Sequence, residues 1–282
     1  MVYEPRNYRS LHQEKDLHHF QVKLEETDLD IGIKKKLYTP ELPKEVELFL
    51  VKERQVLKEY IKTHPAFLTT LQPWNPIQPS NSEQAPATLQ TPAPVYSPTT
   101  EQSLTLGKGT LPFVPFVIKE MCEAASLAGV GPMAAVAGYF AEQVGLFLAK
   151  GFSSDVLVEN GGDIWLKSSH TRKVCIYAGE SPFSQRIGLE IRAQEMPLGI
   201  CTSSGTVGHS FSFGCADAVV ILAPSAPLAD AVATAACNMV QGEADLAKAV
   251  EWAVNTPGVH GAVAILGDKM AVQGKVELIP LS

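Results

Sequence analysis

The 282-residue sequence has no excess of positive charge. It holds 23 Lys and Arg against 30 Asp and Glu, a net charge of −7, and its longest basic run is Lys34–Lys36. A protein that binds nucleic acid mainly through phosphate contacts needs clustered Lys and Arg, so we expect no nucleic-acid partner. Aromatic residues are sparse at 7%, but the apolar share of 45% is enough for a sizeable buried core.

A long uninterrupted apolar run is also missing. Residues Met1–Arg6 are polar and no apolar run follows them, so we expect no signal peptide. The least polar stretch, Val130–Lys150, contains three glycines, Pro132 and Glu142, which favours a core helix over a membrane span. We therefore expect a cytoplasmic protein without a membrane partner.

The cysteines are few, and their spacing forms no paired motif. Five cysteines are widely spaced and none forms a CxxC pair, which argues against a zinc site or a redox dithiol. We interpret them as free core residues in a reducing cytoplasm. Cys201 adjoins a loop rich in hydroxyl groups, so a reactive thiol that carries sulfur is an alternative there.

Glycine is almost absent from the front of the chain. Only Gly32 precedes residue 107, and the other 20 glycines follow it, whereas residues 1–106 carry 26 of the 53 charged residues. We therefore expect the functional residues in the glycine-rich part of the chain after residue 106.

Residues 77–107 are rich in Gln, Pro, Ser and Thr. This composition cannot bury enough apolar area to offset the entropy lost on ordering, so we predict a disordered insertion.

The hydrophobic periodicity predicts an α+β fold with a mainly antiparallel sheet packed by helices. Residues 20–33 alternate as strand, with a change of parity near Glu25 that indicates a tight turn or a bulge. Strands and helices come in blocks rather than as a regular βαβ series. Further strands are predicted at 155–159, 164–167, 173–177, 187–192, 198–202, 217–223, 261–266 and 275–279, and helices at 44–62, 113–127, 133–149, 226–240 and 244–255.

Two loops concentrate polar side chains and glycines. The first holds Asn160, Gly161, Gly162 and Asp163 between two strands; a hairpin turn explains this pattern, and so does a ligand that approaches the backbone. The second begins at Thr202, Ser203, Ser204 and Gly205 and reaches His209. Its hydroxyl and N–H groups suit a phosphate, although a plain surface loop is the alternative. His209 would serve as a general base or as a structural residue.

A third pattern lies on the helix predicted after residue 225. Asp230 and Thr234 are four residues apart, so they share one helix face among alanines and valines. A carboxylate and a hydroxyl with small neighbours can hold a Mg²⁺ that also touches a phosphate. The alternative, which we weight equally, is that Asp230 caps the first helical turn.

In combination these motifs resemble the ApbE superfamily, whose best-known members are FAD:protein FMN transferases. Val158–Ile164 resembles the GGD turn of that family, Thr202–Gly205 its TSG loop, and Ala229–Ala235 its ADALAT motif. Segments along the whole chain also resemble an ApbE-like family of archaea and bacteria. The resemblance implies a T-fold-like domain in which residues 1–76 complete the core formed by 108–282, with the insertion 77–107 between them.

The resemblance also implies roles for the motif residues. Asp230 and Thr234 would ligate Mg²⁺, and His209 would be the catalytic base that activates an acceptor hydroxyl. A target Ser or Thr would then displace AMP from FAD. The cofactor, FAD or FMN, would be bordered by the turn and the hydroxyl loop, that is by Asn160, Gly161, Gly162, Asp163, Thr202, Ser203, Ser204 and Gly205.

The sequence departs from the flavin transferases after His209, where their Asp-Pro is absent. Three hypotheses therefore stand. The chain is an ApbE-like protein that binds a flavin or another phosphorylated nucleotide with Mg²⁺, and is an FMN transferase with a protein acceptor. Alternatively, it is a non-catalytic accessory factor in sulfur assimilation, which helps homocysteine formation from aspartate semialdehyde with a sulfur-transfer partner. Otherwise it is a plain ligand-binding module. A homo-oligomer stays open in each case.

Overall fold

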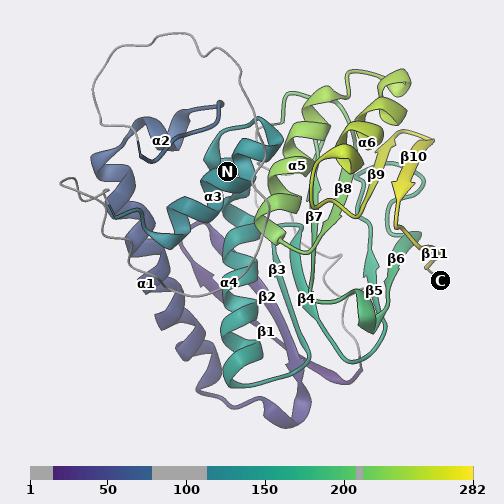
Figure 1. The fold of residues 1–282 in the computed structure, drawn as a ribbon. Helices are drawn as coiled ribbons and strands as arrows, with labels where there is room; N and C mark the ends of the chain where they lie inside the picture. The colour runs from purple at the N-terminus through teal and green to yellow at the C-terminus, as the bar shows by residue number, and fades with distance from the viewer. Residues whose placement is uncertain (1–14, 78–112, 208–211, 282) are drawn as a thin grey trace.

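The computed structural model of the chain describes residues 15–77, 113–207 and 212–281. The predicted disordered insertion lies, apart from Ile77, outside the described residues, and so does the predicted catalytic base His209. Within the described part, α+β is the correct class, because two antiparallel sheets and a set of helices form three layers (Figure 1).

The larger sheet has eight strands in the order β1-β2-β3-β4-β7-β8-β9-β10, and every neighbouring pair is antiparallel. A second sheet has the order β11-β6-β5. The strands of the larger sheet are β1 (Leu17–Leu24), β2 (Thr27–Lys34), β3 (Val156–Asn160), β4 (Asp163–Lys167), β7 (Leu198–Ser203), β8 (Ala218–Ala223), β9 (Gly261–Leu266) and β10 (Lys269–Gly274), and those of the smaller are β5 (Arg172–Cys175), β6 (Ile187–Ile191) and β11 (Leu278–Pro280).

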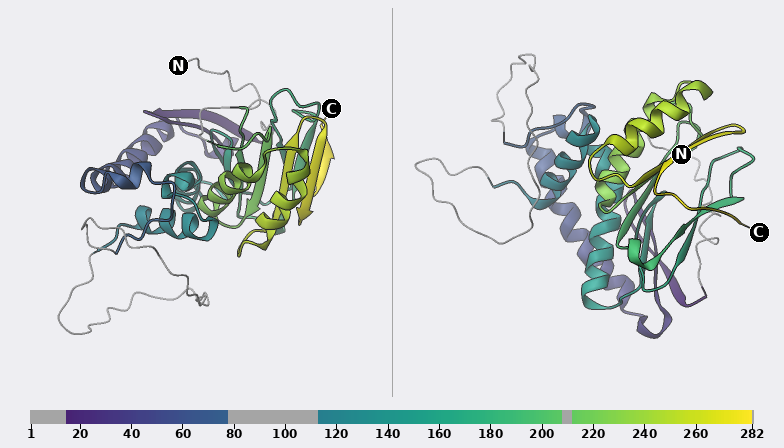
Figure 2. Two further views of the ribbon diagram at one scale, coloured as in Figure 1. Left: turned by 90° about the horizontal axis from the view of Figure 1, so that it is seen from above. Right: turned by 45° about the vertical axis from the view of Figure 1, so that its right-hand side comes forward.

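The helices cover one face of the larger sheet, and the smaller sheet covers the other (Figure 2). Alternate residues of a strand point to opposite faces, so each central strand contributes to two cores. Val158 and Trp165 pack against the helices, whereas Leu157 and Ile164 pack toward the smaller sheet. The helices are α1 (Leu42–Thr63), α2 (Ala66–Thr69), α3 (Phe116–Ala128), α4 (Val136–Gly151), α5 (Ala226–Met239) and α6 (Leu246–Asn255), with single 3₁₀ turns at Lys35–Leu37, Pro132–Ala135, Ala193–Glu195 and Glu243–Asp245.

The predicted turn in 20–33 is confirmed. Strands β1 and β2 pair from Leu17↔Lys34 to Leu24↔Thr27, and Glu25 in the turn has a φ of 55°. This tight turn reverses the chain and changes the parity of the apolar residues. Strand β2 also pairs with β3, so residues before and after the insertion share one sheet.

The prediction was wrong near the C-terminus. It placed one strand at 275–279, but the chain forms β10 at Lys269–Gly274 and the short β11 at Leu278–Pro280. Strand β10 lies at the edge of the large sheet, and most of its residues are exposed. An edge strand that buries neither face carries no clear apolar alternation, so the pattern was missed.

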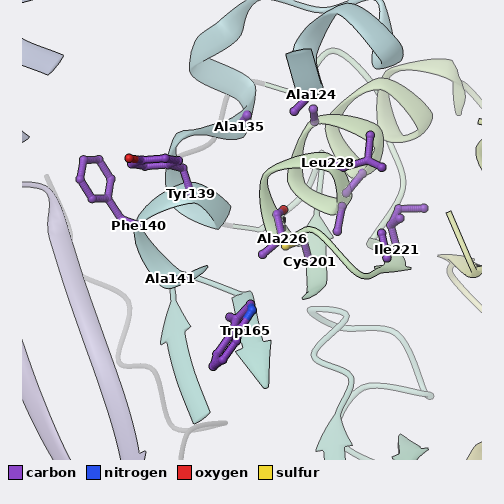
Figure 3. Close-up of a cluster of buried hydrophobic side chains, with 14 of the residues drawn as sticks. Ala124, Ala135, Tyr139, Phe140, Ala141, Trp165, Cys201, Ile221, Ala226 and Leu228 are labelled. Carbon is purple, nitrogen blue, oxygen red and sulfur yellow. Dashed lines mark hydrogen bonds between the residues drawn. The ribbon is translucent and has the colours of Figure 1, made fainter. Parts of the chain in front are cut away.

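One helical stretch, Pro132–Gly151, is long and apolar enough by length and composition to cross a membrane. Half of it is buried inside the protein, where α4 packs against the central strands. Gly145 lets this helix approach Trp165 of β4, since a Cβ at Gly145 would lie 2.1 Å from the indole ring (Figure 3). The stretch is therefore a core helix, as the sequence predicted.

Candidate functional site

The two polar loops meet at one end of the central strands. Asn160 ends β3 and pairs with Asp163 at the start of β4, and Asp163 pairs with Cys201 of β7. Directly opposed residues point to the same face of a sheet. Asn160, Asp163 and Cys201 therefore face the helices together with Ser203, whereas Thr202 faces the other way.

The predicted turn is a hairpin that also shapes the site. Gly161 and Gly162 have φ values of 70° and 104°, a region that favours glycine and that the two central residues of a tight hairpin turn require. The Gly162 N–H donates to Glu159 Oε1 at 2.8 Å, and Glu159 is fully buried. The turn is thus held rigidly, with Asn160 and Asp163 at its two ends.

Asp230 connects α5 to the start of α4. Its Oδ2 accepts the Gly138 N–H at 2.8 Å, and the Ala137 N–H also donates to this carboxylate. Asn160 donates to the Ala137 carbonyl at 3.1 Å, which ties the turn to the same helix end. Asp230 therefore caps a helix, but that helix is α4, since Ser225 caps α5 by accepting the Leu228 N–H.

Asp163 is a buried carboxyl group with one oxygen unsatisfied. It accepts hydrogen bonds from the Cys201 thiol and from the Thr202 N–H, yet its Oδ1 has no hydrogen-bond partner among the described residues. Burial raises the pKa of Asp163 well above its usual range, and the nearby carboxylates of Asp230 and Glu159 raise it further. A buried acceptor without a partner is costly, so this oxygen is suited to a cation or a donor group.

The pKa of Asp230 is also raised. Burial raises it to about 7, although the N–H groups of Gly138 and Ala137 act in the opposite direction. Among the described residues no three His, Cys, Asp or Glu side chains converge as a metal site. Two carboxylates with hydroxyl, carbonyl, water or phosphate oxygens do fit Mg²⁺, which keeps several waters and binds through one or two carboxylates. Thr234 lies one helical turn beyond Asp230 and is partly exposed.

The hydroxyl loop is closed by its own hydrogen bonds. Ser204 Oγ accepts the N–H groups of Thr206 and Val207 at 3.1 and 2.9 Å. The Gly205 N–H donates to the Ala216 carbonyl, and a Cβ at Gly205 would lie 1.8 Å from the Gly214 carbonyl oxygen. Ser204 and Gly205 thus shape the loop, and among the described residues no hydrogen bond joins either of them to Asp163 or Asp230.

Cys201 does not fit the role of a sulfur carrier. Its side chain is fully buried, and its thiol also contacts the Ala226 carbonyl oxygen at 3.3 Å (Figure 3). Burial raises the pKa of this thiol well above its usual range, and the carboxylates of Asp163 and Asp230 add to the effect. Thiolate chemistry needs a lowered pKa and access, so that hypothesis is wrong for this residue. The accessory role in sulfur assimilation stays a prediction from the sequence.

Glu142 lies near the site, although no motif of the sequence indicates it. This carboxylate of α4 accepts the Ala226 N–H at 2.6 Å, at the start of α5. Burial raises the pKa of Glu142 to about 7. The signal in the sequence is that Glu142 is the only acidic residue in the otherwise apolar stretch Val130–Lys150.

Comparison with known proteins identifies the family of this chain. A family model described as "AbpE bacteria" matches residues 96–272. A UPF0280 protein of Methanopyrus kandleri is 36% identical over 265 residues, which cover 92% of this chain and 91% of the relative. A UPF0280 protein of Methanococcus vannielii is 35% identical over 245 residues, covering 86% and 85%. One from Methanocella arvoryzae is 47% identical over 165 residues, covering 58% and 67%.

Solved structures with similar folds include two of the ApbE type. The flavinyl transferase ApbE of Pseudomonas stutzeri is 13% identical with a TM-score of 0.48, and the match covers 92% of this chain and 94% of that one. The apbe protein of Thermotoga maritima is 14% identical with a TM-score of 0.49, covering 92% and 96%. The family model and the relatives define the class as ApbE-like. The chain belongs to the family that the model describes, and its curated relatives carry the name UPF0280 protein.

Proposed function

We propose that this protein binds FAD together with Mg²⁺ at the end of β3, β4 and β7. The observation that carries the proposal is the Asp163 Oδ1 atom, which is buried close to the Asp230 carboxylate and has no hydrogen-bond partner in the part of the chain that the structure describes. Asp163 is buried and Asp230 is partly exposed, and neighbouring carboxyl groups with raised pKa values repel each other when both are ionised. A divalent cation between them would remove that repulsion and supply the missing partner.

The donor set suits Mg²⁺ better than a softer metal. Asp163 and Asp230 supply oxygen ligands, and the hydroxyl of Thr234 is the third candidate, on the same helix face as Asp230. An ion held by so few protein groups keeps open positions for waters or for phosphate oxygens. That geometry favours a phosphorylated ligand over a stand-alone structural metal.

The choice of flavin rests on membership of an ApbE-like family and on the resemblance of the three motifs. The proposed reaction is transfer of FMN to a Ser or Thr hydroxyl of an acceptor protein, with AMP as the leaving group. Mg²⁺ would polarise the pyrophosphate that is cleaved. The chain itself would orient the nucleotide by the rigid Gly161–Gly162 turn and by Asn160. We place the protein in the cytoplasm because none of its five cysteines, all within the described residues, forms a disulfide.

Titration calorimetry with FAD tests the proposal. We expect binding in the presence of Mg²⁺, a loss of at least about tenfold in affinity when EDTA is added, and a similar loss in Asp163→Asn, which keeps the shape but not the charge. Asp268→Asn is the matched control, because Asp268 is exposed and pairs with its neighbour Lys269 on the surface. Chromatography for AMP then separates transferase from binding protein. Equal affinity for FAD with EDTA and in Asp163→Asn would contradict the proposal.

A further inference from the structure

Helix α5 carries a third polar residue in register with the candidate metal pair. Asp230, Thr234 and Asn238 follow one another at four-residue intervals, so they form a stripe along one face of the helix. Eight residues of helix separate the first from the last, about 12 Å. Asp230 is anchored on α4, and the question is what Asn238 holds at the other end.

Asn238 holds the segment that follows the hydroxyl loop. Its Oδ1 accepts the Phe213 N–H at 2.7 Å and the Ser212 hydroxyl at 3.1 Å. Gln241 adds a second anchor, since its Nε2 donates to the Phe213 carbonyl at 3.1 Å. Phe213 itself is 64% exposed, so its backbone is fixed by these polar contacts and not by burial of its ring.

The segment then packs tightly on the end of α5. The Cys215 N–H donates to the Val240 carbonyl at 2.8 Å. A Cβ at Gly214 would lie 1.7 Å from the Cys237 carbonyl oxygen, so only glycine allows this approach. The approach matters for the loop, because Gly214 is also the residue against which Gly205 packs.

A continuous chain of contacts therefore runs from Asn238 to the hydroxyl loop. Asn238 accepts the Phe213 N–H, and the next residue, Gly214, packs against Gly205. The Gly205 N–H in turn donates to the Ala216 carbonyl oxygen. The same helix carries Asp230. We propose that Asn238 is a positioning residue that sets the position of Ser204 and Gly205, the part of the hydroxyl loop beyond β7, relative to the carboxylates of Asp163 and Asp230. The inference rests on the proposed function, because it assumes that both parts contact one nucleotide.

The proposed role requires that the side chain at position 238 supply a hydrogen-bond acceptor. This requirement distinguishes a positioning residue from a merely structural one. The hydrogen bonds that the Asn238 side chain makes to Ser212 and Phe213 both use its oxygen. Aspartate has the same shape and supplies an oxygen there, and Asn238 is partly exposed, so water can solvate the charge. Alanine supplies no acceptor and leaves the Phe213 N–H without this partner. Asn238→Asp should therefore behave as wild type and Asn238→Ala should not.

The experiment measures FAD affinity and Mg²⁺ response separately in the full-length chain. We expect Asn238→Ala to weaken FAD binding by about tenfold, the usual effect of one lost hydrogen bond that orients a binding group. Its Mg²⁺-induced rise in melting temperature should be unchanged, because Asp230 lies about two helical turns away. Asn238→Asp should restore the affinity. Gln241→Ala, which removes the second anchor, should weaken FAD binding even if Asn238→Ala proves unstable.

Hydrogen exchange at the Phe213 amide tests the hydrogen bond between this amide and Asn238. Among these variants, only Asn238→Ala should make the amide exchange faster than in wild type. Wild-type affinity for FAD in both Asn238→Ala and Gln241→Ala would overturn the inference, as would an Asn238→Asp variant as weak as Asn238→Ala. A wild-type chain that binds no FAD with Mg²⁺ would instead overturn the proposed function. The two failures are therefore distinguishable.

Discussion

The Asp230 carboxylate of α5 accepts the backbone N–H of Gly138 at the start of α4, at 2.8 Å. The reverse contact also exists, because Glu142 of α4 accepts the Ala226 N–H at the start of α5. Each helix thus supplies a carboxylate to the N-terminus of the other. Free N–H groups and the helix dipole both favour negative charge at such ends. Gly138 permits the crossing, since a Cβ there would lie 2.4 Å from the Ala226 carbonyl oxygen.

Because Asp230 of α5 accepts N–H groups at the N-terminus of α4, two substitutions of Asp230 should have different effects. Asp230→Ala removes the acceptor for the N–H groups of Ala137 and Gly138, so we expect the free energy of unfolding to fall by about 1–2 kcal/mol. Asp230→Asn keeps an oxygen acceptor and removes a charge that is partly withdrawn from water, so its stability at pH 8 should stay near wild type. Urea unfolding measures both. Equal stability of Asp230→Ala and wild type would show that Asp230 does not hold the end of α4.

The stability of the protein should depend on pH through Glu142. The pKa of Glu142 is raised to about 7 in the folded chain, above its ordinary value, mainly by burial. A folded-state pKa that is raised favours folding at low pH, and this contribution is lost as the pH rises through about 7. We expect the melting temperature to fall between pH 5 and pH 8, and to fall less in Glu142→Gln, which still accepts the Ala226 N–H. Glu123→Gln on the exposed surface of α3 is the control and should follow wild type. An identical slope in Glu142→Gln would contradict the assignment.

Asp155 should show the opposite dependence on pH. Its side chain is fully buried and bonded to Lys34, Ser168 and the Ser169 N–H. Burial alone would raise the pKa of Asp155, but these partners hold it far below its usual range. Its stabilisation is therefore present above about pH 4 and is lost as the pH falls. Asp155→Asn should lower the free energy of unfolding by roughly 3 kcal/mol at pH 7, because it breaks a buried charged network.

The measurement for Asp155 is a pair of urea curves at pH 7 and pH 3.5. The difference between Asp155→Asn and wild type should shrink at the lower pH. Asp268→Asn, a change in an exposed surface pair, should leave both curves unchanged. A difference that stays constant between the two pH values would mean that the carboxylate charge is not the source of the stabilisation.

Local patterns predicted most elements and the end of the sheet where the motifs gather. Alternation located β3, β4 and β7 to within one or two residues, and antiparallel pairing of neighbours then brings Asp163 beside Cys201. The pattern also predicted correctly that Asp230 and Thr234 share a helix face. Local sequence does not predict which residues lie opposite this face of α5. The contact between Asp230 and Gly138 spans 92 positions, and no periodicity encodes it.

The same limit explains the sites that were missed. Glu142 lies in an apolar stretch where a single carboxylate looks like an exposed position of a helix. Its partner is a backbone N–H 84 positions away, and a backbone group leaves no mark in the sequence. A reactive Cys201 was the alternative that its neighbours in the chain suggested, but the packing of Ala226 over it buries the thiol, which agrees with the predicted core cysteine. Long-range packing therefore decides the chemistry of residues that look alike in sequence.

Two glycines of α4 should respond oppositely to the same substitution. A Cβ at Gly145 would lie 2.1 Å from the Trp165 ring, whereas a Cβ at Gly151 would meet nothing within 4 Å. Gly145→Ala should therefore lower the free energy of unfolding by about 1–3 kcal/mol through overpacking. Gly151→Ala should not lower it, because alanine favours the helix. Urea unfolding of the two variants checks this, and a Gly145→Ala variant as stable as Gly151→Ala would show that α4 does not press against Trp165.

The five thiols should react in an order set by burial. Cys215 is partly exposed, whereas the other four cysteines, Cys122, Cys175, Cys201 and Cys237, are buried. Burial raises the pKa of Cys122 to about 12 and that of Cys175 to about 11, and it also raises the pKa values of Cys201 and Cys237. Since the thiolate is the reactive form, these four should stay inert in the folded protein.

Labelling with a thiol reagent at pH 8, followed by peptide mass analysis, tests this order. We expect one thiol per chain to react quickly, at Cys215, and the other four to react only after unfolding in urea. Cys215→Ser should abolish the fast phase, and Cys201→Ser should leave it intact. Fast modification of Cys201 in the native protein would require that the packing of Ala226 over its thiol opens readily, and it would reopen the hypothesis of a sulfur carrier at this position.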